Sequence, residues 1–259
     1  MTMTTPMLID VSTAVGRWPF CRRQSITPAG LSSLLKRAGV DLALTSSLEA
    51  VFHEDPDEDN RLLFHQLGGH KRLVPVPVVN PRMADWRDVV GRWAPKAPAV
   101  KILPSYHAFS LADANVAALA AELMRRGKPL MVQMRMEDER VQAPAFRVPP
   151  VPVADIVALA GRFPRLNIVA LSAYRQEAAD LVAQAPRVWV DVSMLDGMDT
   201  VGAAVRLNRA FAGRLMLGSH SPLYYTRSAV LKVQTAEVTA AVRQAILGGT
   251  ARKLLKLKL

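Results

Sequence analysis

The chain contains a single cysteine, Cys21, among its 259 residues. One cysteine excludes an internal disulfide, and scarce cysteine is typical of proteins in a reducing compartment. No apolar run approaches the roughly 18 residues that a membrane-spanning helix needs. The first residues also lack the basic region and long apolar segment of a secretory signal. We therefore expect a cytoplasmic protein with no membrane partner.

Three features that define common functional classes are also missing. No glycine-rich phosphate loop follows an early strand, because Gly68-Gly69 comes after a helical segment. Cysteine and histidine are nowhere spaced as in a zinc site. Basic residues are not interleaved with aromatic residues, as they are on surfaces that stack nucleic-acid bases. These absences argue against a nucleotide-binding sheet, a structural zinc site and a nucleic-acid partner.

Acidic residues are the minority among the charged residues, with 22 Asp and Glu against 33 Lys and Arg, for a net charge of +11. A strongly basic surface attracts anionic ligands and partners. The basic residues are spread along the chain, and only the amphipathic tail over 252–259 concentrates them. We expect a small anionic substrate. The tail is a candidate docking segment for an acidic protein partner or for a second copy in a homo-oligomer.

Half of the residues are hydrophobic, and they form short runs that alternate with helical patterns. Continuous apolar runs are typical of parallel strands that are buried on both faces. Eight strands are predicted, at 7–11, 42–46, 73–79, 99–103, 129–134, 167–171, 187–192 and 214–218. Most are followed by a helical segment, and a closing helix is predicted over 237–247. This order predicts an α/β fold, a (β/α)8 TIM barrel forming one domain over 1–259. A doubly wound sheet is the alternative.

Four segments carry a resemblance to a known family. They are Ile9-Asp10-Val11 with Ser12-Thr13-Ala14, Val100-Lys101-Ile102-Leu103-Pro104, Gly218-Ser219-His220-Ser221-Pro222, and Gly248-Gly249-Thr250-Ala251-Arg252. Together they resemble the amidohydrolase superfamily, in its type 2 branch of decarboxylases and lactonases. The resemblance implies a TIM barrel that hydrolyses lactones or amides, or that decarboxylates aromatic and unsaturated acids. Some lactone-hydrolysing relatives work without a metal.

The positions that the resemblance assigns to metal ligands are largely replaced in this chain. Ser12 and Ala14 stand where the family has a His-x-His pair, and His220 stands in place of an aspartate. Gln133 and Ser172 occupy the ligand positions of strands five and six, and Leu103 replaces another family histidine. Hydroxyl and amide groups are poor ligands for zinc. We therefore expect no cofactor. A zinc site rebuilt from histidines, such as His53, His107 and His220, is the alternative.

Polar residues at strand ends are the catalytic candidates, because barrel active sites lie at the C-terminal ends of the strands. His220 is the predicted general base, and its alternative role is a hydrogen bond to a loop carbonyl. Lys101 lies within a predicted strand, so its ammonium should pair with Asp10 or Asp191 or face the polar mouth. His107 or Tyr106 is predicted to polarise a substrate carbonyl, and Lys101 or Arg135 to hold a substrate carboxylate. The predicted catalytic set is His220, His107, Lys101 and Asp10.

A second group of residues is predicted to bind substrate. Arg135 and Arg140 could clamp a carboxylate bidentately, or form a salt-bridged loop network with nearby acidic residues. Arg17 has the same ambiguity, with loop packing as its alternative. The complete predicted binding set is Arg135, Arg140, Tyr106, Gln133, Arg17, Ser172 and Ser219.

These residues lead to one main functional hypothesis. It is a metal-independent, amidohydrolase-like hydrolase that acts on a small carboxylate-bearing substrate such as a lactone or an amide. One alternative is a catalytically silent barrel that serves as a binding or scaffold subunit. Another is a metal-dependent hydrolase or decarboxylase with a rearranged site. The sequence does not identify the substrate.

Overall fold

A computed structural model describes residues 7–20, 26–197 and 199–257. Cys21 and the last two residues of the basic tail lie outside the described residues. All eight predicted strands are confirmed: β1 (Ile9–Val15), β2 (Leu42–Ser47), β3 (Leu73–Pro75), β4 (Val100–Ile102), β5 (Leu130–Gln133), β6 (Ile168–Leu171), β7 (Val188–Asp191) and β8 (Leu215–Met216). Every pair of neighbouring strands is parallel, and the fold is the predicted TIM barrel.

Backbone hydrogen bonds connect the strands into a ring. The strands form two parallel sheets, in the orders β1-β2-β3 and β4-β5-β6-β7-β8. The segment after β3 bridges to β4, where the Lys101 amide donates to the carbonyl of Pro77 at 2.9 Å. On the other side, the Val11 amide of β1 donates to the carbonyl of Leu217, just after β8, at 2.9 Å. The ends of all eight strands therefore surround one centre.

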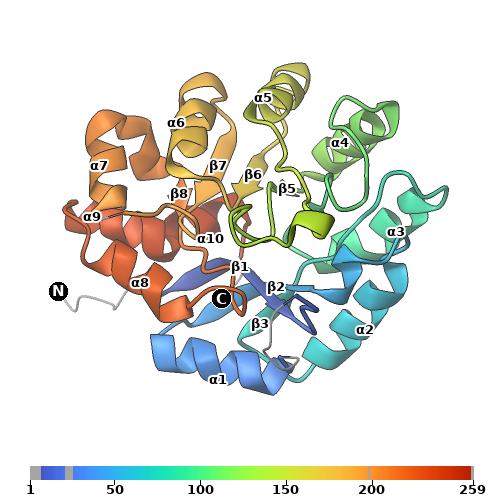
Figure 1. The fold of residues 1–259 in the computed structure, drawn as a ribbon, viewed down its shortest axis with the longest axis horizontal. Coiled ribbons are helices and arrows are strands. Elements are labelled where there is room, and N and C mark those ends of the chain that lie inside the picture. Colours follow the sequence, from blue (N-terminus) through green and yellow to red (C-terminus); the bar gives the residue numbers. More distant parts are fainter. Residues whose placement is uncertain (1–6, 21–25, 198, 258–259) are drawn as a thin grey trace.

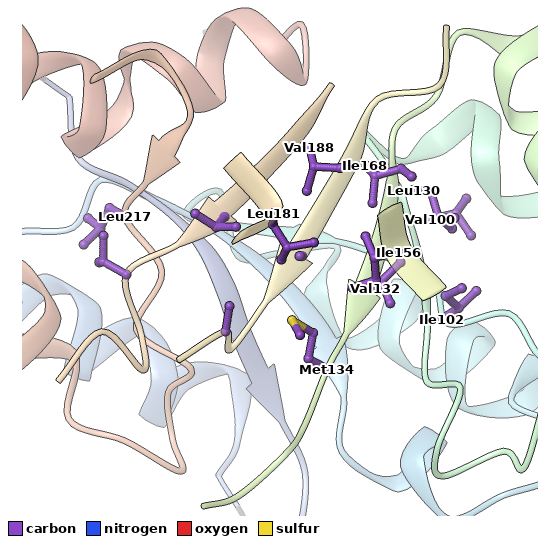
Figure 2. Close-up of a cluster of buried hydrophobic side chains, with 14 of the residues drawn as sticks. Val100, Ile102, Leu130, Val132, Met134, Ile156, Ile168, Leu181, Val188 and Leu217 are labelled. Atoms are coloured by element: carbon purple, nitrogen blue, oxygen red, sulfur yellow. The ribbon is translucent and has the colours of Figure 1, made fainter. Parts of the chain in front are cut away.

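Helices cover the outside of the strands (Figure 1). They are α1 (Pro28–Ala38), α2 (Asp57–Leu67), α3 (Trp86–Trp93), α4 (Ala114–Arg126), α5 (Val153–Arg162), α6 (Arg175–Gln184), α7 (Thr200–Leu207), α8 (Thr226–Gln234), α9 (Ala240–Gln244) and α10 (Thr250–Leu254). Side chains from strands and helices meet in the main hydrophobic core. Figure 2 shows Val132 of β5 and Ile168 of β6 with Ile156 of α5 and Leu181 of α6. No helix among the described residues is long and apolar enough to span a bilayer.

β1 and the closing helix extend beyond their predicted ends, whereas β3 stops at Pro75 instead of residue 79. β1 continues through Val15 rather than ending at residue 11, because its hydroxyl-bearing residues pair with β2: the Thr13 hydroxyl donates to the carbonyl of Leu44 at 2.8 Å. The closing helix does not end before Gly248-Gly249 but runs from α9 through a π-helical turn (Ala245–Gly249) into α10. A Cβ at Gly248 would lie 2.2 Å from the carbonyl oxygen of Met7, so glycine there allows this helix to pack against the start of β1.

Candidate active site at the barrel mouth

A small inner cavity lies where β1, β2 and β4 and the segment after β8 end. Its volume is about 10 Å³, which is room for one water molecule. Its lining includes the polar residues Lys101, His220 and Thr13, together with the apolar residues Leu103, Met136 and Leu223. The structure therefore brings together two of the predicted catalytic residues, Lys101 and His220, at the predicted end of the barrel.

The Lys101 side chain is buried in the barrel wall. Burial lowers the pKa of its ammonium from 10.5 to about 8, and the charge of Asp191 opposes this shift. No hydrogen bond contributes to that pKa, and no side chain in the described part of the chain forms an ion pair with Lys101. A buried cation without a direct partner is costly. Lys101 is therefore a costly buried cation in the lining of the inner cavity, and the nearby charge of Asp191 favours its charged form.

His220 is held in its neutral form. Its Nε2 lies 2.8 Å from the carbonyl oxygen of Met136, so Nε2 carries the hydrogen and Nδ1 is left as the acceptor. Burial and, less strongly, the charge of Lys101 lower the His220 pKa to about 4. The backbone of His220 has a φ of 53°, a left-handed conformation that is rare outside glycine and recurs at functional sites.

Two buried carboxyl groups flank the end of β8. Asp10 of β1 accepts hydrogen bonds from the backbone amides of Ser12 and Ser219, at 3.0 and 2.9 Å. Asp191 of β7 accepts from the Ser172 amide and from the hydroxyl of Ser193. Burial raises the Asp10 pKa to about 7 and the Asp191 pKa to about 6. In each carboxyl group the Oδ2 atom has no hydrogen-bond partner among the residues that the structure describes.

Glycine at position 218 makes this arrangement possible. A Cβ on Gly218 would lie 2.5 Å from Oδ2 of Asp191, so a larger residue would displace that carboxyl group. The sequence prediction named Asp191 only as one of two possible partners for Lys101. The electrostatic effect on Lys101 comes from Asp191 and not from Asp10.

The predicted binding residues Gln133 and Ser172 connect the ends of β5 and β6, and Ser219 bonds within the segment after β8; none of the three lines the inner cavity. The Gln133 amide donates to the Ser172 hydroxyl at 2.9 Å and to the carbonyl oxygen of Arg135. Ser172 has a φ of 62° and is fully buried. The Ser219 hydroxyl accepts from the Ser221 amide at 3.2 Å. Their hydrogen bonds hold the strand ends that carry His220 and Asp191 in place.

His107 and Tyr106 lie in the loop after β4. Nε2 of His107 is 2.9 Å from the carbonyl oxygen of Ala50, and its buried Nδ1 has no partner among the described residues. Burial lowers the His107 pKa, so its imidazole is also neutral. Burial raises the pKa of the Tyr106 hydroxyl. Neither residue lines the inner cavity, so carbonyl polarisation by His107 stays a prediction.

The arginines form the salt-bridged arrangement that was the alternative to a substrate clamp. Arg135 donates to Glu139 at 2.8 Å, to the carbonyl oxygen of Ser172 at 2.7 Å, and to both carboxylate oxygens of Glu177. Its side chain is only 1% exposed. Because a buried guanidinium is costly without partners, these acceptors stabilise it. The exposed Arg140 pairs with Asp138. The loop spacing gave no signal for Glu177, which lies on α6.

Arg17 and His53 lie away from the inner cavity. The Arg17 amide donates to Glu49 at 2.9 Å, in an exposed loop. The imidazole of His53 bonds Asp59 through Nδ1 at 2.8 Å. Neither side chain is among the residues that line the cavity of Lys101 and His220.

Apolar side chains fill the mouth of the barrel around the inner cavity. This mouth cluster consists of Ala14, Trp18, Leu48, Ala50, Val51, Val78, Leu103 and Met136, with Tyr106 and Leu223 packed against it. Ala14 and Leu103 occupy positions where the resemblance places histidines. Their replacement therefore removes imidazoles and also supplies apolar packing at the mouth.

Asp10→Asn should make stability less dependent on pH. Because the Asp10 pKa is about 7 in the folded protein and 3.8 as a free group, the unfolded chain loses this proton first as pH rises. The free energy of unfolding then falls by about 1.4 kcal/mol per pH unit between pH 3.8 and pH 7, and it levels off above pH 7. From pH 5 to 7 the native protein should lose about 2–3 kcal/mol more than the variant. Calorimetry at both pH values measures the difference, and parallel Tm changes would contradict it.

Solved structures of similar fold place the chain among known barrels. One is a protein proposed to be a 2-pyrone-4,6-dicarboxylic acid hydrolase, from Pseudomonas putida (19% identity, 99% of this chain and 100% of that chain, TM-score 0.71). A dihydroxybenzoic acid decarboxylase from a Polaromonas species has 13% identity, 97% coverage of both chains and a TM-score of 0.73. A 5-carboxyvanillate decarboxylase from Novosphingobium aromaticivorans has 12% identity, 97% coverage of both chains and a TM-score of 0.71. No curated protein sequence matches the chain.

These neighbours contradict the expectation that no cofactor is involved. Both decarboxylase structures hold bound manganese, so the precedent for this fold is a metal cofactor rather than none. The described residues of this chain do not fit such an ion. They contain no group of three or more His, Cys, Asp or Glu side chains that could hold a metal. The alternative zinc site is not assembled either, because His53, His107 and His220 each bond a different protein group.

The family assignment comes from the sequence as a whole. The profile of the amidohydrolase family matches residues 6–257, which is nearly the whole chain. This match agrees with the parallel barrel and with the position of the candidate site at the strand ends. The chain belongs to the amidohydrolase family.

Proposed function

We propose that this protein hydrolyses a small carboxylate-bearing molecule, such as a lactone or an amide, at the inner cavity. The observation that carries the proposal is that a buried Lys101 and a neutral His220 line the same cavity at the strand ends. Titratable groups with strongly shifted pKa values gather at functional sites. The similarity to decarboxylases of aromatic acids and to a proposed pyrone dicarboxylate hydrolase supports a carboxylated substrate.

His220 is the proposed general base. Its Nε2 hydrogen is committed to the carbonyl of Met136, which fixes the ring and leaves the Nδ1 lone pair available. A water molecule in the inner cavity would donate to Nδ1, and His220 would take its proton as the water attacks the substrate carbonyl. The low pKa keeps His220 unprotonated at neutral pH, so the acceptor is present throughout that range.

Lys101 is the proposed electrostatic partner of the substrate. Its ammonium would stabilise the negative charge that develops on the carbonyl oxygen in the tetrahedral intermediate. This interaction is strong in a water-poor site, and it would also relieve the cost of the unpaired buried charge. Asp10 and Asp191 are positioning residues in this proposal: Asp10 holds the Ser219 amide next to His220, and Asp191 stabilises the ammonium.

Substrate entry requires movement of the mouth cluster. The inner cavity holds about 10 Å³, whereas pockets for small ligands usually measure several hundred. Leu103, Met136 and Leu223 complete its wall and would have to move aside for a carbonyl group to reach Lys101. Closing again over the substrate would exclude bulk water.

His220→Ala should lower turnover of a carboxylate-bearing lactone or amide by about 10²- to 10⁴-fold, the usual effect of removing a general base. Turnover is measured on a panel of such substrates with the native protein, the variant, and His65→Ala as the control. His65 is exposed on α2, so its replacement should leave turnover unchanged. Unchanged turnover in the His220 variant, with activity present in the native protein, would remove His220 from the mechanism.

A catalytically silent barrel is the second candidate function, and the mouth cluster is the observation that favours it. Ala14 and Leu103 pack into this cluster instead of offering polar groups to a substrate. The silent barrel predicts saturable binding of carboxylated molecules without turnover on any member of the panel. A cytoplasmic location and the absence of a nucleic-acid partner stay part of the proposal for either function, supported by the single cysteine and the scattered basic residues. The role of the basic tail in assembly stays a prediction.

A further inference from the structure

Aromatic side chains from four separate segments, which follow β1, β2, β4 and β5, gather outside the mouth of the barrel. The rings of Phe20 and Phe146 have centroids 5.6 Å apart, and those of Phe20 and Phe52 are 6.0 Å apart. Phe52 in turn contacts Tyr106 edge to face at 6.4 Å. Trp18 of the mouth cluster packs against the inner side of this row, with its ring centroid 5.1 Å from that of Phe52. The row therefore has a buried base and an open outer side.

This row forms part of a second, larger cavity. The outer cavity has a volume of about 370 Å³ and is lined by Phe20, Phe52, Tyr106, Glu137, Val141, Gln142, Ala143, Phe146, Arg147 and Val148. The inner and outer cavities share no lining residue. The volume of the outer cavity lies within the range of small-molecule sites. It is therefore a candidate site that the proposed hydrolysis does not use.

The exposed aromatic rings need an explanation. Phe20, Phe52 and Phe146 are 50%, 42% and 63% exposed. Large exposed apolar residues that cluster, rather than scatter, mark binding sites. With Val141, they account for four of the nine large hydrophobic residues that are exposed within the described residues. Almost half of these exposed residues thus line one cavity.

The charge of the outer cavity points to the class of ligand. Arg147 is exposed at its edge, and no ion pair with Arg147 occurs in the described ranges. Glu137 is the one carboxyl group among the described lining residues, and burial raises its pKa while a hydrogen bond from Trp18 opposes that shift. A guanidinium can bind a carboxylate bidentately while the rings stack on a flat partner. The lining therefore complements a flat ring that carries one negative charge.

We propose that the outer cavity is a binding site for a planar aromatic monoanion. The ring of the ligand lies against Phe20, Phe52 and Phe146, and its anionic group pairs with Arg147. The site is separate from the cavity of Lys101 and His220, so binding here does not depend on hydrolysis there. The proposed site lies on the loops that surround the mouth cluster. Its lining includes none of the positions that the family resemblance assigns to metal ligands.

Isothermal titration with 2-naphthoate tests the proposal directly. We expect saturable binding that is weakened about tenfold by Arg147→Gln, which removes the charge, and to a similar degree by Phe146→Ala, which removes one ring. Glu137→Gln should tighten binding several-fold because it removes a competing negative charge. Arg165→Gln is the matched control, since Arg165 is an exposed arginine in the loop between α5 and β6, at the opposite end of the barrel. Circular dichroism checks that each variant is folded.

Two comparison ligands separate the aromatic and the charge contributions. Decahydronaphthalene-2-carboxylate keeps the carboxylate without a planar ring, and 2-naphthylmethylamine keeps the ring with a positive charge. Both should bind at least tenfold more weakly than 2-naphthoate. Equal binding of the saturated acid would overturn the aromatic part of the proposal, and tighter binding of the amine would assign the cavity to a cation facing Glu137.

The protein variants provide two further outcomes. An equal loss of affinity in the Arg147 and Arg165 variants would show that only the general positive charge of the protein attracts the anion. Binding that survives in His220→Ala while turnover is lost would separate this site from the proposed function.

Discussion

Replacing Lys101 with methionine is expected to raise the stability of the protein while it strongly lowers turnover. Burial lowers the Lys101 pKa from 10.5 to about 8, and each pH unit of that shift corresponds to about 1.4 kcal/mol of destabilisation of the charged form. Methionine fills a similar space without charge. This shift already includes the attraction to Asp191, so the variant should gain about 3 kcal/mol at pH 7, a rise in Tm of about 6–12 °C.

The dependence on pH separates this effect from simple repacking. A lysine with a lowered folded pKa destabilises the native state below that pKa and stops doing so as pH rises from about 8 to 10.5. The gap in Tm between Lys101→Met and the native protein should therefore narrow toward pH 10. Lys71→Met, a change at an exposed lysine, should leave Tm nearly unchanged at every pH. A variant that is less stable than the native protein at pH 7 would contradict the prediction.

The same substitution tests the proposed chemistry. Removing one donor to a developing oxyanion lowers kcat by about 10²- to 10³-fold in other hydrolases. The native protein should lose activity above about pH 8, where Lys101 gives up its proton. Residual activity of Lys101→Met should lack that alkaline decline. Higher stability with lost activity is the expected signature of a residue kept for function at the expense of the fold.

The sequence predicts the strands of this barrel well because buried parallel strands are apolar on both faces. Runs such as Leu130–Gln133 have few alternatives in a chain that alternates them with amphipathic helices. The extension of β1 through Val15 was missed because Ser12 and Thr13 are polar and their partners on β2 are about thirty residues away. The helix through Gly248 was missed because glycine normally ends a helix, whereas here it permits close packing against β1.

The site is less predictable than the fold because its geometry depends on partners that are distant in sequence. Strand position alone places Lys101 and His220 at the mouth, and the structure brings them to one cavity. No pattern within a single segment identifies the outer cavity, since its rings at positions 20, 52 and 146 come from three loops. The same limitation applies to Arg135, whose local acidic neighbours suggest a clamp or a loop network but do not reveal its partner on α6.

Arg135→Met is expected to destabilise the protein by about 3 kcal/mol, a loss of about 6–12 °C in Tm for a chain of this length. The guanidinium joins the end of β5 to the Ser172 carbonyl after β6 and to Glu177 on α6, and it stacks on Tyr174 at 4.0 Å. Methionine would leave the carboxylates of Glu139 and Glu177 without their cation. Arg140→Met is the matched control: Arg140 is 82% exposed on the same loop, and surface pairs contribute little.

Thermal unfolding and steady-state kinetics together decide between the two roles that the sequence allows for these arginines. If Arg135 holds the strand ends, its replacement lowers Tm strongly, and the Arg140 variant keeps the native Tm within about 1 °C. If either arginine clamps a substrate carboxylate, its replacement raises KM without a matching loss of stability. The Glu177→Gln variant extends the test. If the Arg135–Glu177 pair is structural, this variant should reproduce part of the loss of Tm that Arg135→Met causes. Native stability in Arg135→Met with a raised KM would assign Arg135 to the substrate and would leave the α6 contact without an energetic role.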